Sequence, residues 1–165
     1  MTAAPILRSA TAADLPAISA IYNHYVRTST ATYQLAEDTP AERAAWFAAH
    51  GPGHAVTVCV ADGAVVAWGS LSPFHPRAAF ARTLEDSLYV HPAHLRRGLG
   101  RLLLTDLIAR ARAAGAHSII AAISADQAPS LALHRAYGFS PCGTLREVGR
   151  KFDGWLDLAY LQLLV

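Results

Sequence analysis

Two long stretches of the chain repeat apolar residues at helical spacing. The first follows Thr11–Asp14, which fits a capping box, and its apolar positions are Ile18, Ile21, Tyr22, Tyr25 and Val26. The second is Gly98–Ala114, which stops before Gly115 and pairs Asp106 with Arg110 at i,i+4 spacing. Its predicted buried face comprises Leu103, Leu104, Leu107, Ile108 and Ala111. Two shorter helices are predicted, one opened by Thr39–Glu42 and ended by Gly51–Gly53, the other over Ser130–Tyr137.

Apolar runs between these helices predict seven strands. They are Pro5–Ala10, Ala55–Ala61, Val65–Leu71, Leu84–Val90, His117–Ser124, Gly143–Val148 and Trp155–Val165. Asp62-Gly63 is a hairpin turn signal, Ser72–Arg82 predicts a loop, and Gly149–Gly154 separates the last two strands. The order β-α-α-β-β-β-α-β-α-β-β predicts an α+β fold. Its mixed, mostly antiparallel sheet contains one parallel crossover and is flanked by about four helices in a three-layer α/β/α arrangement.

The composition narrows the class of protein. We expect a single domain over residues 1–165, because 53% of the residues are apolar and 16% are charged. A net charge of +2 is too small to indicate a nucleic-acid partner. The two cysteines, Cys59 and Cys142, have no metal-binding or redox spacing. No signal peptide or membrane-spanning apolar run is evident, so we expect a soluble cytoplasmic protein without a membrane partner.

The segment Arg96–Arg101 predicts an anion-binding site. It places Gly98 and Gly100 in the first turn of a helix that follows a strand. Unpaired backbone N–H groups at such a helix start bind phosphate well when little side-chain bulk covers them. The glycine pattern matches neither the dinucleotide-binding nor the P-loop motif, and a solvated basic helix start is the alternative.

Glu85 lies on the strand that leads to this segment and is a candidate general base. A carboxylate whose pKa is raised by burial can accept a proton from a nucleophile at neutral pH. The alternative is a surface ion pair between Glu85 and Arg82 or Arg77.

Several motifs, spread over the whole chain, resemble the GNAT superfamily of N-acetyltransferases. The acetyl-CoA signature of that family is similar to Val90–Pro92 followed by Arg96–Arg101. The resemblance is closest to the branch that acetylates phosphinothricin and methionine sulfone or sulfoximine. The further segments that resemble this branch are Ile21–Tyr25, Ser29–Tyr33, Ser70–Phe74, Thr83–Val90, Ser130–Phe139 and Lys151–Asp157.

The resemblance implies acetyl-CoA as cosubstrate, a small-molecule amine as acceptor, a homodimer, and roles for individual residues. The implied cofactor-binding residues are Leu88, Tyr89, Val90, Arg96, Arg97, Gly98, Leu99, Gly100, Arg101, Gln127 and Ser130. The implied substrate-binding residues are Tyr25, Tyr33, Phe74, His75, Arg77, Glu85, Asp86 and Ser87. Glu85 is the implied base, and the N–H of Val90 is an oxyanion donor if the sheet splays beyond this strand. His134 stands where many relatives carry a tyrosine that protonates the leaving thiolate; an acid role and a cofactor-contact role both remain open.

The chain departs from the family pattern at Leu95, Gln127, Gln34 and His75. The departure at Gln127 affects one hydrogen bond to the cofactor, and those at Gln34 and His75 leave the acceptor amine open. An unrelated amine or a protein N-terminus is the alternative acceptor. A non-catalytic acyl-CoA-binding module is the alternative class of protein. His91 and His94 are spaced like metal ligands, but no third ligand is evident, so we predict no metal site.

Overall fold

The computed structural model describes residues 4–165, and its elements follow the predicted order. The strands are β1 (Ile6–Ser9), β2 (Val56–Ala61), β3 (Ala64–Pro73), β4 (Thr83–Val90), β5 (Ser118–Ser124), β6 (Ser140–Lys151) and β7 (Gly154–Leu164). The helices are α1 (Leu15–Thr28), α2 (Pro40–Ala48), α3 (Leu99–Ala113) and α4 (Ala128–Ala136). Short 3-10 turns cover Ala12–Asp14, Ala78–Phe80 and Pro92–His94.

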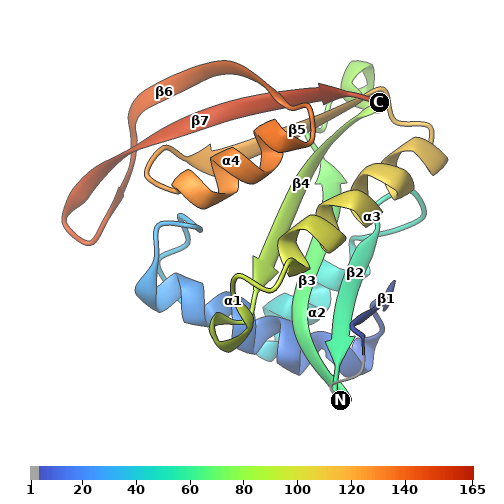
Figure 1. Cartoon of the computed structure of the whole chain (residues 1–165). Coiled ribbons are helices and arrows are strands. Elements are labelled where there is room, and N and C mark those ends of the chain that lie inside the picture. Colours follow the sequence, from blue (N-terminus) through green and yellow to red (C-terminus); the bar gives the residue numbers. More distant parts are fainter. Residues whose placement is uncertain (1–3) are drawn as a thin grey trace.

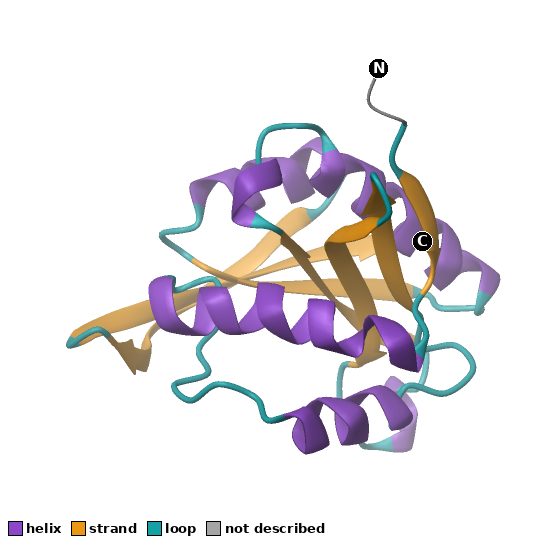
Figure 2. Cartoon of the chain, turned by 90° about the horizontal axis from the view of Figure 1, so that it is seen from below, coloured by secondary structure: helices purple, strands orange, loops and turns teal. Residues whose placement is uncertain are grey.

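The seven strands form one mixed sheet in the order β1-β2-β3-β4-β5-β7-β6 (Figure 1). All neighbouring strands pair antiparallel except β4 and β5, which are parallel and joined through α3. Helices cover both faces of the sheet (Figure 2). The predicted fold class is therefore confirmed.

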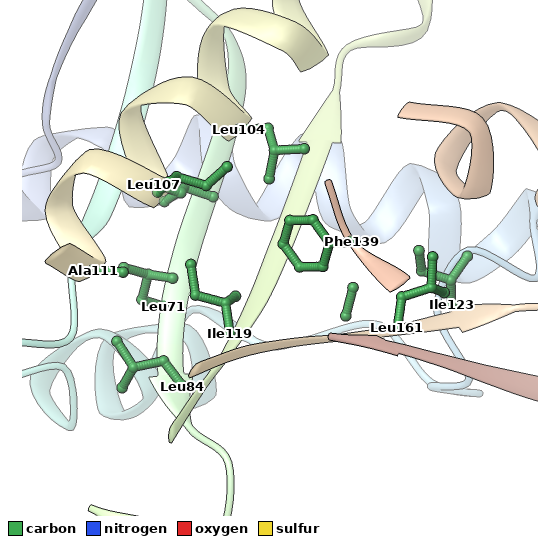
Figure 3. Packing of buried hydrophobic residues seen from close by; sticks show 11 residues of the cluster. Leu71, Leu84, Leu104, Leu107, Ala111, Ile119, Ile123, Phe139 and Leu161 are labelled. Atoms are coloured by element: carbon green, nitrogen blue, oxygen red, sulfur yellow. The ribbon is translucent and has the colours of Figure 1, made fainter. Parts of the chain in front are cut away.

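Each face of the sheet has its own apolar core. Under α3 and α4, the predicted face of α3 packs on β3, β4, β5 and β7, as Figure 3 shows for Leu104, Leu107 and Ala111 facing Leu71 and Ile119. On the opposite face, Ile18 and Ile21 of α1 pack with Trp68 of β3, and α2 adds Trp46 and Phe47. The central strands are thus buried on both faces and hold the functional residues in a rigid frame.

Local signals set several helix ends as predicted. Asp14 accepts hydrogen bonds from the N–H and hydroxyl of Thr11 at 2.8 and 3.0 Å, which forms the first capping box. Thr39 and Glu42 form the second. Gly115 follows α3 with a φ of +74°, a left-handed conformation that glycine adopts readily.

The last hairpin differs from the prediction. Gly149–Gly154 does not separate two strands, because β6 continues to Lys151 and β7 begins at Gly154. Phe152 and Asp153, both with positive φ, form the two-residue turn. The far end of this hairpin projects beyond the helices (Figure 1). In the described part of the chain, no helix has the length and hydropathy of a membrane span.

Candidate active site

β4 and β5 separate halfway along β4. Their parallel pairing runs only from Thr83–Ser118 to Asp86–Ala121, and the two strands then diverge (Figure 1). β4 itself stays paired with β3 up to Val90. A pocket of about 560 Å³ lies between the separated strands and is lined by residues of α1, β4, α3, β5 and α4. The edge of β4 that β5 has left is therefore open to a ligand.

Backbone groups of β4 point towards this open edge. The N–H of His91 donates to the carbonyl oxygen of Val66 on β3 at 2.8 Å. Because successive N–H groups of a strand alternate in direction, those of Leu88 and Val90 face away from β3, towards the pocket. The Tyr25 hydroxyl agrees with this direction, since it donates to the carbonyl oxygen of Val90 at 2.6 Å. The N–H group that the sequence predicts as a donor is therefore free to donate to a ligand in the pocket.

The first turn of α3 borders the same pocket and offers unpaired N–H groups. Gly98 is the N-cap residue, with a φ of +80°, and its carbonyl oxygen accepts the first helical hydrogen bond from Leu102 at 3.1 Å. The N–H groups of Leu99, Gly100 and Arg101 therefore have no acceptor within the helix. At Gly100 a Cβ atom would stand 3.2 Å from Cδ2 of Leu133 on α4, so glycine keeps this corner open. These features fit the diphosphate of a coenzyme.

Glu85 is half-buried on the α1–α2 face of β4, opposite Ser72 of β3. Burial, together with the nearby charge of Asp86, raises the pKa of its carboxyl group. Among residues 4–165, no ion pair involves Glu85, and the Nε of Arg82 instead donates to the carbonyl oxygen of Gly115 at 2.9 Å. The arrangement favours a base over a surface ion pair.

His134 and Asp86 form a buried pair on the other face of β4. Nε2 of His134 lies 2.9 Å from Oδ2 of Asp86, and Nδ1 lies 2.8 Å from the carbonyl oxygen of Ser130. The side chains are 3% and 1% exposed. Sequence reasoning expected Asp86 to border the same space as Glu85. The alternation of side chains along β4 places it instead on the opposite face.

The structure brings most of the other predicted residues together. All implied cofactor-binding residues except Arg97 line the pocket, as do Tyr25, Ser87 and His134. Tyr33 is not among the lining residues, and its hydroxyl donates to the carbonyl oxygen of Asp157 at 2.9 Å. Phe74, His75 and Arg77 lie in the segment between β3 and β4, where the rings of Phe74 and His75 pack against Phe80.

Sequence reasoning missed the β5 wall of the pocket and part of the α4 wall. The lining residues it did not select as binding residues are Ala31, His94, Leu95, Ala122, Ile123, Ser124, Pro129 and Leu133. It also missed Lys151, whose Nζ donates to the carbonyl oxygens of Ser29 and Thr32 at 2.7 and 2.8 Å and so holds the segment around Ala31. The available signal was that Lys151 is the only lysine of the chain.

Known proteins are similar to this chain in sequence and in architecture. The model of the acetyltransferase (GNAT) family matches residues 18–139. The L-methionine sulfoximine/L-methionine sulfone acetyltransferase of Pseudomonas paraeruginosa is 42% identical over 95% of this chain and 92% of its own length.

Two solved structures contain acetyl-CoA. An acetyltransferase from Salmonella typhimurium with this cofactor is 39% identical, with a TM-score of 0.94 over 98% of this chain and 94% of that one. A phosphinothricin acetyltransferase from Sinorhizobium meliloti in complex with acetyl-CoA is 37% identical, with a TM-score of 0.94 over 98% and 88% of the two chains. The family match, the shared fold and the pocket between β4 and β5 together show that this chain belongs to the GNAT family and is an acetyl-CoA-dependent N-acetyltransferase.

Proposed function

We propose that this enzyme, acting as a single domain, transfers the acetyl group of acetyl-CoA to the amino group of a small amino acid or a close analogue. Methionine sulfone, methionine sulfoximine and phosphinothricin are the acceptors we expect first. One observation carries the chemistry. The parallel strand pairing ends at Asp86, and the next N–H groups of β4 open onto a pocket whose lining begins at Ser87, two residues after half-buried Glu85.

The proposed reaction uses groups at the open edge of β4 and on its α1–α2 face. The first turn of α3 holds the diphosphate, and the N–H of Val90 donates to the thioester carbonyl. Glu85, directly or through a water molecule, accepts the proton of the attacking amine. A C–N bond then forms, the C–S bond breaks, and the electron pair of that bond leaves with sulfur as CoA thiolate. The products are the N-acetylated amino acid and free CoA.

The acceptor class rests on the relatives and on the segment between β3 and β4. The names of the similar proteins specify methionine sulfoximine, methionine sulfone and phosphinothricin, which are amino acids carrying an oxidised sulfur or phosphorus group. His75 and Arg77 are cationic or hydrogen-bonding groups suited to such oxygens or to a carboxylate. We propose that they bind the head group of the acceptor.

Thiol release from acetyl-CoA, measured against a panel of amino acids and their sulfone, sulfoximine and phosphinic analogues, tests the proposal. We expect rapid CoA release with at least one analogue. Glu85→Gln should lower kcat by about a hundredfold to ten-thousandfold, with the KM for acetyl-CoA unchanged. Glu147→Gln makes the same change at an exposed position and should behave like the wild type. If no amino acid in the panel releases CoA, the proposed acceptor class is wrong.

We further propose a cytoplasmic homodimer. The proposal is supported by the apolar side chains of Val148, Phe152 and Trp155, each more than half exposed on the β6–β7 hairpin. Two free cysteines and the use of acetyl-CoA support a reducing, cytoplasmic compartment. Sedimentation should give the mass of a dimer for the wild type and of a monomer for Trp155→Lys.

A further inference from the structure

The imidazole of His134 has both ring nitrogens occupied by acceptors. Nδ1 faces the carbonyl oxygen of Ser130 at 2.8 Å, and Nε2 faces Oδ2 of Asp86 at 2.9 Å. A carbonyl oxygen only accepts, so Nδ1 carries a proton. The second proton of the pair lies between Nε2 and the Asp86 carboxylate. A ring held in this way has no N–H left to donate to a third group.

The pocket is bordered by the ring and not by the carboxylate. His134 is a lining residue, whereas Asp86 is not and lies behind it at the last parallel pair of β4 and β5. The other oxygen of Asp86, Oδ1, is buried without a hydrogen-bonding partner. Within residues 4–165, His134 is therefore the one side chain that compensates this buried carboxylate. A ligand in the pocket meets the ring first.

We propose that Asp86 is a positioning residue that holds His134 as a doubly protonated, immobile imidazolium, which stabilises the departing CoA thiolate as a fixed charge and does not donate a proton to it. This proposal rests on the proposed acetyl transfer. The thiolate leaves with the electron pair of the broken C–S bond and takes its proton later from water. A thiolate is a tolerable leaving group because the pKa of a thiol is only about 8.5.

The charges around the ring agree with this assignment. Burial lowers the pKa of His134, but the hydrogen bond and charge of Asp86 outweigh it, so the pKa lies above the ordinary histidine value. Glu85 is on the opposite face of the sheet, and Phe139 packs edge-on against the ring at 5.0 Å between centroids. The other ionisable side chains lining the pocket, from α1, β4, α3 and the segment before α3, are Tyr25, Tyr89, His94, Arg96 and Arg101.

The first test compares Asp86→Asn with the wild type across pH. Asparagine keeps the size and the acceptor oxygen but removes the charge that favours imidazolium. The ratio of mutant to wild-type kcat should be highest at acidic pH and fall about tenfold for each pH unit between the lowered and the original pKa of His134. The titration of the substrate amine cancels in this ratio. Loss of the Asp86 charge lowers the pKa of Glu85, which raises the ratio only in the acid limb and leaves the fall at higher pH to His134. Asp62→Asn, on the exposed turn between β2 and β3, is the matched control and should give a ratio of one at every pH.

The second test observes the ring itself and needs no activity. Nitrogen-15 NMR of histidine-labelled protein, assigned with His134→Gln, should show one imidazolium that persists above the ordinary histidine pKa of about 6.5 and titrates at lower pH in Asp86→Asn. A pH-independent kcat ratio would mean that Asp86 is only structural. A neutral His134 ring in the free wild-type enzyme would overturn the proposal. An inactive wild type with a persistent imidazolium would instead contradict the proposed acceptor class and leave the pairing established.

Discussion

At the scale of single residues, the burial of the Asp86–His134 pair predicts how much stability is lost when one partner is removed. Removing one partner of a buried ion pair leaves an uncompensated charge, which costs about 3–5 kcal/mol. We expect His134→Ala to lower the free energy of unfolding by that amount in urea denaturation at neutral pH. His134→Gln, which keeps a hydrogen-bond donor for Asp86, should lose less. Equal losses in the two variants would contradict this account.

The pKa of Glu85 predicts the acid limb of the activity profile. A base must be ionised to accept a proton, and burial together with Asp86 raises the pKa of this carboxyl. As the pH is lowered, kcat/KM should therefore begin to fall at a pH above the ordinary glutamate pKa of about 4.3. Measured profiles of the wild type and Glu85→Gln check this, since the variant should lack that limb. A wild-type profile that stays flat down to pH 4.5 would exclude Glu85 as the base.

At the scale of elements, the start of α3 is a constrained stretch of the pocket backbone. Gly98 has a φ of +80°, a conformation that costs other L-residues roughly 1–2 kcal/mol. We expect Gly98→Ala to lower stability by about that amount and to weaken acetyl-CoA binding, because relief of the strain turns the N–H groups of the first turn. Calorimetric titration and urea denaturation measure both effects.

A matched variant controls for the added methyl group. Gly51 has no positive φ, and a Cβ there would meet nothing within 4 Å, so Gly51→Ala should leave acetyl-CoA affinity unchanged. If both variants bind acetyl-CoA like the wild type, the backbone of Gly98 is not part of the anion site.

The elements best predicted from the sequence are those set by local signals. The buried face of α3 and the two capping boxes depend on residues three or four positions apart, so their patterns are visible in one dimension. β6 was predicted too short because nearly all of this edge strand is exposed on both faces and shows no alternation. Its Gly149 read as a breaker, although in the fold it makes room for the ring of Tyr33.

At the scale of the whole molecule, contacts between distant segments were the part that the sequence did not reveal. Asp86 and His134 lie 48 positions apart, and Lys151 reaches back 119 positions to Thr32. Family resemblance selected His134 and Ser130 as site residues, but the motif that contains them does not show what the imidazole contacts. The sequence suggested the divergence of β4 and β5 only as a condition for the oxyanion role of Val90. In the structure, this divergence decides which backbone groups of β4 lack a strand partner.

The same divergence predicts how acetyl-CoA stabilises the fold. The pocket is lined by residues of α1, β4, α3, β5 and α4, and β4 and β5 are not paired with each other along it. A ligand that binds only the folded state at 100 times its Kd adds about 2.7 kcal/mol. For a domain of this size, that should raise Tm by roughly 5–10 °C.

Acetylpantetheine, which keeps the thioester arm and lacks the nucleoside diphosphate part, is the matched ligand. Because it cannot engage the N–H groups of Leu99, Gly100 and Arg101, it should raise Tm far less than acetyl-CoA at the same concentration. Differential scanning calorimetry of the wild type with each ligand gives the comparison. Equal shifts would mean that the thioester arm alone supplies the binding energy. The start of α3 would then be a solvated basic turn, the alternative that its sequence left open.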